Sequence, residues 1–185
     1  MGLDMYLYCN SKRVCKEANE RDDSWEGEFE TPRGIVISWR KANAIHNWFV
    51  ENVQNGCDDC GIYEVSIERL AELHDTCKEV LESTKLIDAE IENGKVLKDG
   101  KWVPNMEPGQ KLENPTKAKE LLPTQSGFFF GSVEYDKWYW RDLEYTMDKL
   151  EVIMKNLVPY GDYGWWVAHK DEPDWVVRFY YTASW

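Results

Sequence analysis

Strand-like patterns lie at both ends of this chain, and helical patterns lie between them. In residues 3–8 apolar side chains alternate with more polar ones, which indicates a half-buried strand. Residues 175–184 are rich in the β-branched and aromatic residues that favour strands. Residues 134–157 carry the most regular helical spacing of apolar residues. This order predicts one α+β domain over residues 1–185, with a mainly antiparallel sheet and helices packed on one face.

Further elements follow from local signals between these segments. The patterns predict a strand at 34–39 and helices at about 40–54, 67–83 and 115–122. Ser66 is the expected N-cap of the second of these helices. Polar segments predict a long loop at 10–33 and an exposed hairpin or mobile insertion at 86–112, and the turn DEPD predicts a C-terminal β-hairpin around it.

The charge of the chain restricts its partners. Its 185 residues include 34 acidic and 22 basic ones, a net charge of -12. Such a surface repels phosphate backbones, so we expect no binding to nucleic acid; it favours a basic protein partner or simply keeps the protein soluble. No apolar run approaches the roughly 20 residues that span a membrane, and no secretory signal is evident, so we expect a cytoplasmic protein. Five cysteines then do not indicate a disulfide framework.

Residues 121–132, LLPTQSGFFFGS, raise the question of a phosphate-binding loop. The two glycines flank three phenylalanines, and no lysine of a Walker pattern follows, so a phosphate loop is excluded. Phe128, Phe129 and Phe130 instead predict a strand buried on both faces. The polar residues at its ends either satisfy local turns or bind a ligand on a rigid scaffold.

A candidate ligand site joins these polar ends to the helix that begins near residue 40. Spacing predicts that Arg40, Asn43 and Asn47 share one face of that helix. Arginine matches carboxylates and phosphates, and histidine transfers protons near neutral pH. An anion or nucleotide pocket would use the following residues: Arg40, Asn43, His46, Asn47, Thr124, Gln125, Ser126 and Tyr135. The alternative is a helix face that ties neighbouring loops by hydrogen bonds.

A zinc site is the second candidate. Cys57 and Cys60 are followed by His74 and Cys77, a spacing that could build a tetrahedral site. Against it, Cys77 falls inside the apolar stripe of its helix, where a free cysteine behaves as a small hydrophobic residue. Bound structural zinc and buried inert thiols are therefore both open readings, and no other cofactor is indicated.

Several long sequence blocks resemble one protein family. They are MGLDMYLY, WRKANAIHNWFV, DDCGIYEVS, LLPTQSGFFFGS, YDKWYWRDLEYTMDKL and RFYYTASW. Together they are similar to a family of uncharacterised proteins of bacteriophages and prophage regions that open with MGLDMYL. The resemblance implies a phage or prophage setting, but it carries over no activity and no catalytic residues.

Three functions are compatible with the sequence. No nucleophile motif is present, so we expect a non-catalytic accessory protein that binds a host protein or an anionic nucleotide-like small molecule to counter host defence. The alternatives are an enzyme acting on a nucleotide or small phosphorylated compound, with Arg40 and His46 in its site, and a zinc-stabilised structural protein. Both a monomer and a homo-oligomer are compatible with the sequence.

Overall fold

The computed structural model describes residues 2–18, 25–26, 33–160, 165–168 and 176–185. No helix within these residues is both long enough and apolar enough to cross a membrane. In chain order the elements are β1 (Asp4–Cys9), α1 (Lys12–Ala18), β2 (Trp25–Glu26), β3 (Arg33–Arg40), α2 (Asn43–Asn52), β4 (Tyr63–Val65), α3 (Ile67–Ser83), β5 (Leu86–Lys98), β6 (Lys101–Leu112), α4 (Thr116–Leu121), α5 (Lys137–Lys155), β7 (Val158–Tyr160), β8 (Trp165–Val167) and β9 (Phe179–Ser184).

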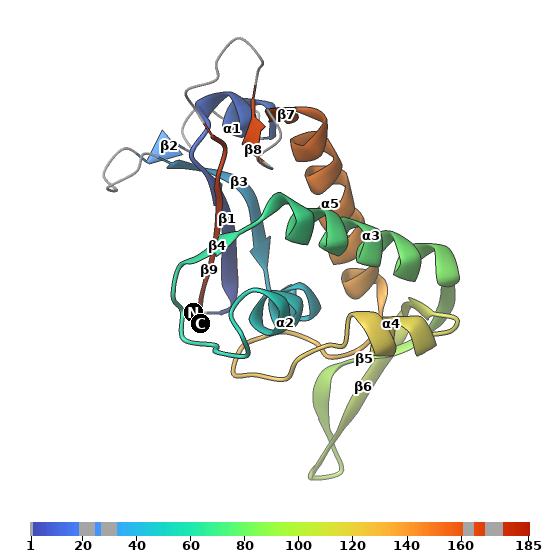
Figure 1. Cartoon of the computed structure of the whole chain (residues 1–185). Helices are drawn as coiled ribbons and strands as arrows, with labels where there is room; N and C mark the ends of the chain where they lie inside the picture. The colour runs from blue at the N-terminus through green and yellow to red at the C-terminus, as the bar shows by residue number, and fades with distance from the viewer. Residues whose placement is uncertain (1, 19–24, 27–32, 161–164, 169–175) are drawn as a thin grey trace.

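The main sheet has the strand order β2-β3-β1-β9-β4, and every neighbouring pair is antiparallel. The first and last long strands are neighbours, with Asp4 opposite Ser184 and Cys9 opposite Phe179. The two chain ends therefore lie side by side (Figure 1). The predicted α+β class with an antiparallel sheet is confirmed.

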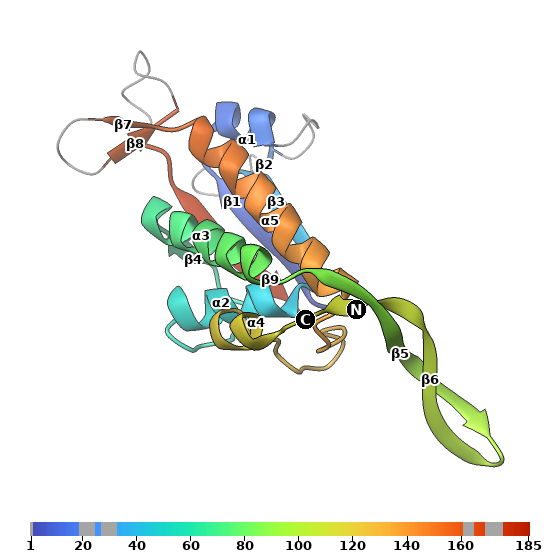
Figure 2. The ribbon, with the colours of Figure 1, turned by 90° about the vertical axis from the view of Figure 1, so that its right-hand side faces the viewer.

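One face of the sheet carries the core. Leu3, Met5 and Leu7 of β1 are fully buried, as their alternation predicts. On neighbouring strands of the same face, Trp39 donates from its indole N–H to the Thr146 hydroxyl of α5 at 2.8 Å, and Tyr181 stacks on Phe49 of α2 with ring centroids 3.9 Å apart. Helices α2 and α5 thus cover this face, and α3 packs beside α5 (Figure 2).

The two long helices begin at side-chain caps. The Ser66 hydroxyl accepts a hydrogen bond from the Arg69 N–H, so the predicted cap of α3 is confirmed. The Asp136 carboxylate accepts from the N–H groups of Trp138 and Tyr139 and fixes the start of α5.

Strands β5 and β6 form a hairpin that projects from the body of the molecule, and we call residues 86–112 the arm (Figures 1 and 2). The predicted exposed hairpin is therefore present, and it turns at Asp99-Gly100. Near the C-terminus β7 and β8 form a hairpin-like antiparallel pair, and a single bridge joins Val167 to Val176. The DEPD turn lies outside the described residues.

The predicted loop at 10–33 is wrong in its first part, because residues 12–18 form α1. The helix is too short to show a period in the sequence, but Val14, Cys15 and Ala18 join the core, and the Ser11 hydroxyl accepts from the Val14 N–H.

The predicted buried strand at the three phenylalanines is also wrong. Within the described residues, positions 128–130 join no ladder; Phe128 and Phe129 form a turn in which Phe129 has a φ of 64°, and Gly131 follows with a φ of 95°. Phe128 is 82% exposed, whereas Phe130 is 4% exposed. The turn puts only the third ring into the core, where it lies across Gly127; a Cβ there would meet the Phe130 ring at 2.5 Å.

Candidate functional site: a cleft at the root of the arm

A cleft of about 580 Å³ opens where four parts of the fold meet. They are the end of β3, the first turn of α2, the loop before α5 and the root of the arm. The side chains that matter for its chemistry are Arg40, Asn43, Glu92, Thr124, Trp138 and Asp142. Three of the predicted ligand residues, Arg40, Asn43 and Thr124, therefore lie on one cleft.

Arg40 reaches this cleft from the strand, not from the helix. It is the last residue of β3, and Lys41 with a φ of 63° turns the chain before α2 begins at Asn43. Arg40 therefore does not share a helix face with Asn43 and Asn47, which corrects the prediction. Its guanidinium is exposed and lies 3.8 Å from the Asp4 carboxylate on the neighbouring strand.

Asn43 holds the wall of the cleft together. Its side-chain amide donates to the carbonyl oxygens of Phe130 and Ser132 at 3.1 and 2.7 Å, and its side-chain oxygen accepts from the Gln125 N–H at 3.2 Å. All three bonds fix the loop of residues 123–132, which has no ladder of its own. The buried Asn43 therefore holds a neighbouring loop by hydrogen bonds, which is the alternative to a ligand-binding role.

The other predicted loop residues take mostly local roles. The Thr124 hydroxyl donates to the Val133 carbonyl, and the Thr124 N–H donates to the Tyr135 hydroxyl. Asn47 makes a long 3.4 Å bond to the Pro123 carbonyl. Ser126 is exposed, and the Gln125 side-chain oxygen is buried with no hydrogen-bond partner among the described residues. Gln125 and Ser126 are not among the residues that line the cleft.

Carboxylates outnumber cations on the cleft wall. Glu92, Glu134, Asp136 and Asp142 line it, against Arg40 and Lys41. Within the described residues the Asp142 carboxylate has no hydrogen bond or ion pair. Burial, and then the negative charge of Asp136, raise the pKa of Asp142 to about 7.

The sequence prediction did not include Asp142 in the site, because its burial becomes clear only in the folded structure. It lies three residues after Tyr139 and four before Thr146, both buried, so α5 turns it toward the inside of the fold. The sequence signal that could have found Asp142 is its position at the edge of the buried face of an amphipathic helix. An unpaired acid in such a place is a common feature of functional sites.

Trp138 supplies an aromatic edge to the cleft. It is exposed on the first turn of α5, and the Arg141 guanidinium carbon lies 5.6 Å from the centre of its ring. This is a cation–π geometry, and it shows that the ring accepts a guanidinium at this distance. The cleft thus combines a free carboxyl with an aromatic surface.

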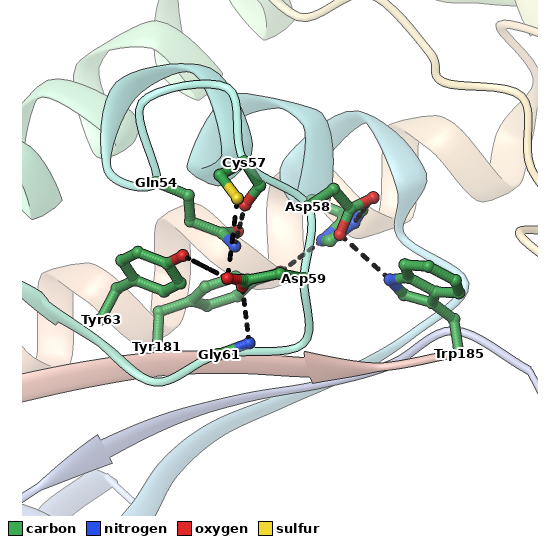
Figure 3. Close-up of polar contacts among 9 residues, drawn as sticks. Gln54, Cys57, Asp58, Asp59, Gly61, Tyr63, Tyr181 and Trp185 are labelled. Carbon is green, nitrogen blue, oxygen red and sulfur yellow. Dashed lines mark hydrogen bonds and ion pairs between the residues drawn. The ribbon is translucent and has the colours of Figure 1, made fainter.

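His46 does not reach the cleft, although it was predicted to. It is fully buried, with Nδ1 2.7 Å from the Tyr181 hydroxyl and Nε2 3.1 Å from the Asp58 carboxylate. The second Asp58 oxygen accepts from the Trp185 indole N–H at 3.0 Å (Figure 3). Burial, and then the charge of Asp58, raise the pKa of Tyr181 well above its usual value. Both ring nitrogens of His46 are occupied, so this is a structural network.

The same loop holds a second acid network. Asp59 accepts from the Gly61 N–H and from the Tyr63 hydroxyl, which lies 2.9 Å away (Figure 3). The Gly61 bond, and then the Tyr63 bond, lower the pKa of Asp59, and Asp59 raises the pKa of Tyr63 to about 12. These contacts shape residues 57–63, where Cys60 has a φ of 57°.

The predicted zinc ligands are not brought together. Cys57 and Cys60 are exposed on this loop, whereas Cys77 is fully buried in α3 and His74 bonds the neighbouring Asp75. Within the described part of the chain no group of three or more His, Cys, Asp or Glu could hold a metal ion. The zinc-site prediction is wrong because Cys77 belongs to the apolar stripe of α3, and that stripe packs its thiol into the core.

Comparison of the chain with models of known protein families, with curated proteins and with solved structures finds no match.

Proposed function

We propose that this chain is a non-catalytic binding protein whose cleft receives a basic side chain of a protein partner. The observation that carries the proposal is the unpaired, half-buried Asp142 carboxyl beside the exposed Trp138 ring. A lysine or arginine side chain would supply the missing charge to Asp142 and lie against the ring. The resemblance to phage and prophage proteins supports a host protein as the partner, met in the host cytoplasm, with an effect against host defence.

The alternative of an anionic small molecule has less support. Arg40 was its expected anchor, but Arg40 lies beside Asp4, and four carboxylates face the same cleft. An anion entering there would meet a negative field. The enzyme alternative has less support because it needs His46 in the site. His46 is enclosed in the core, and both of its ring nitrogens have hydrogen-bond partners.

The test adds three small probes, one at a time, to the folded protein at pH 8: an arginine peptide, a glutamate peptide and adenosine monophosphate. Acetyl-Gly-Arg-Gly-amide should bind weakly and shift the NMR signal of the Trp138 indole N–H, whereas the matched glutamate peptide should not. Asp142→Asn should weaken the arginine peptide about tenfold, the effect of about 1.4 kcal/mol. Asp148→Asn, which removes the same charge from an exposed position of the same helix, should leave binding unchanged.

Two results would overturn the proposal. One is equal binding of both peptides, or arginine binding that Asp142→Asn leaves intact. The other is binding of adenosine monophosphate that Arg40→Ala abolishes, which would restore the anionic ligand as the better reading.

A further inference from the structure

The arm is an isolated two-stranded ladder. β5 and β6 pair from Leu86↔Leu112 out to Lys98↔Lys101, and among the described strands neither joins the main sheet. Figure 2 shows the arm extending well beyond the helices. Two strands alone are marginally stable in water, so a partner that covers one face would stabilise the arm.

The ladder register sorts the side chains of the arm onto two faces. In an antiparallel ladder, residues directly opposite each other point to the same side, and so do alternate residues of one strand. One face therefore carries an exposed apolar row of β6, and we call it the Trp102 face: Trp102, Pro104, Met106 and Pro108. Trp102 is 69% exposed and Met106 49%. Exposed apolar side chains in a continuous row indicate an interaction surface.

A row of carboxylates runs beside this apolar row on the same face. Asp88, Glu90 and Glu92 alternate along β5, and their partners across the ladder are Gln110, Pro108 and Met106. All three acids are exposed. Within the described residues, Glu90 and Glu92 make no hydrogen bond or ion pair. Their charge is therefore available to a cation from outside the chain.

The lysines of the arm leave most of this charge uncompensated. Lys98 and Lys101, at the tip, point to the opposite face, because each is one position from a residue of the Trp102 face. Among the described arm residues, Lys95 is the one cation on the Trp102 face, and it lies beyond the irregularity that follows Glu92.

The acidic end of the Trp102 face is hollowed. A shallow groove of about 900 Å³ lies between the root of the arm and the first turn of α5. Asp88, Glu90 and Pro108 line it from the arm, and Lys137 and Trp138 line it from α5. A partner side chain in this groove would contact carboxylates on one side and an aromatic ring on the other.

Both edges of the arm are protected against strand addition. β6 contains Pro104 and Pro108, which lack an N–H, and β5 is interrupted between Glu92 and Lys95, where Gly94 has a φ of 75°. Prolines and bulges are the usual devices that stop edge pairing. A partner on the arm must therefore pair its own backbone groups, as an α-helix does.

We propose that the Trp102 face binds a basic amphipathic helix of a protein partner. The apolar stripe of that helix packs on the β6 row, and its lysine or arginine side chains lie over the β5 carboxylates. Charge complementarity selects this occupant over an acidic or a purely apolar one. The inference goes beyond the proposed role of the cleft and does not rest on it, because Asp88 and Glu90 are not among the residues that line the cleft.

The dimensions of the face suit a helix. The row from Trp102 to Pro108 spans about 20 Å at about 3.4 Å per residue, which is the length of about 13 helical residues. Carboxylates two positions apart on a strand are separated by about 7 Å, close to the rise of about 6 Å between helical residues four apart. One stripe of basic residues can therefore follow the carboxylate row.

The test is calorimetric titration of the folded protein, in salt of about 0.15 M, with a helical peptide of about 18 residues that carries a leucine stripe beside a lysine stripe. The matched peptide, with glutamate for every lysine, should bind at least tenfold more weakly. Asp88→Asn/Glu90→Gln should weaken the lysine peptide about tenfold. Lys95→Gln/Lys137→Gln should bind it more tightly, because these changes remove the two cations beside the carboxylate row.

Controls separate the arm from the general acidity of the chain. Trp102→Ala should weaken the lysine peptide at least tenfold, whereas Ile62→Ala, at an exposed apolar position outside the arm, should not change its binding. Glu144→Gln/Asp148→Asn removes the same two charges from exposed positions of α5 and should also leave binding unchanged.

Three results would overturn the proposal. The first is equal binding of the two peptides, or lysine-peptide binding that the Asp88→Asn/Glu90→Gln and Trp102→Ala variants retain in full. The second is binding that only Asp142→Asn abolishes, which would place the peptide in the cleft instead. The third is a wild type that dimerises in sedimentation and loses the dimer in Trp102→Ala, which would assign the face to a second copy of the chain.

Discussion

The imidazole of His46 and the hydroxyl of Tyr181 lie 2.7 Å apart in the core, although 135 residues separate them in the chain. The pair joins α2 to β9, and Asp58 closes the network from the loop after α2. A polar pair in so apolar a place stabilises the fold only while every partner is satisfied.

Removing His46 should therefore be costly. His46→Ala leaves the Tyr181 hydroxyl and one Asp58 oxygen without their partner and opens a cavity, so we expect a loss of about 3–5 kcal/mol in the free energy of unfolding. His74→Ala, at a partly exposed position of α3, should cost less than about 1 kcal/mol. Urea unfolding measures both, and equal losses would contradict the structural role of His46.

Asn43 should control the loop that forms the wall of the cleft. Asn43→Ala removes three hydrogen bonds to residues 125, 130 and 132, and we expect a loss of about 2–4 kcal/mol and faster hydrogen exchange at the Gln125 amide. Asn47→Ala, which loses one long exposed bond, is the matched control and should change little. Unchanged exchange in Asn43→Ala would show that the loop holds itself.

The three phenylalanines should differ sharply. Phe130→Ala empties a core position beside His46, where the two rings meet edge to face, and should cost about 3–5 kcal/mol. Phe128→Ala removes an exposed ring and should stay within about 0.5 kcal/mol. Thermal unfolding of the two variants measures the difference, and an equally large loss in both would contradict the exposed position of Phe128.

Asp142 should make stability depend on pH. Its pKa is about 7 in the folded chain and near 3.9 when unfolded, so its favourable contribution is complete below about pH 4 and is lost as the pH rises to 7. Asp142→Asn should therefore stabilise the fold more at pH 8 than at pH 4. The gain should be about 1–2 kcal/mol, since water still reaches the carboxyl.

Asp148→Asn on the exposed side of α5 is the control for this profile. Its melting temperature should differ from that of the wild type by the same amount at pH 4 and at pH 8. A flat profile for Asp142→Asn as well would mean that Asp142 ionises like an ordinary surface acid.

The cysteines should divide into two reactive and three protected thiols. Cys57 and Cys60 are exposed, whereas Cys9, Cys15 and Cys77 are buried. Burial raises the pKa of Cys77 and of Cys9, which further suppresses their thiolates. Brief treatment with iodoacetamide should add two groups to the native protein and five after unfolding, as counted by mass spectrometry. Rapid labelling of Cys77 would contradict its place in the core.

Elements with a long, local residue pattern can be predicted from the amino-acid order alone. Alternation at residues 3–8, the Ser66 cap with the stripe of α3, and the stripe of α5 each record a buried face directly in residue spacing. The hairpin at 86–112 was readable for the same reason, because turn residues and strand propensity act within a few positions.

Which polar residues meet depends on how distant segments of the chain pack together. Their spacing predicts that Arg40 and Asn43 share a helix, but the left-handed turn at Lys41 separates them. His46 is enclosed because β9, which is far away in the sequence, brings Tyr181 to it. The pKa of Asp142 is raised by its burial in the assembled fold and by the charge of Asp136. Such groupings depend on contacts between distant segments, and periodicity carries no information about those contacts.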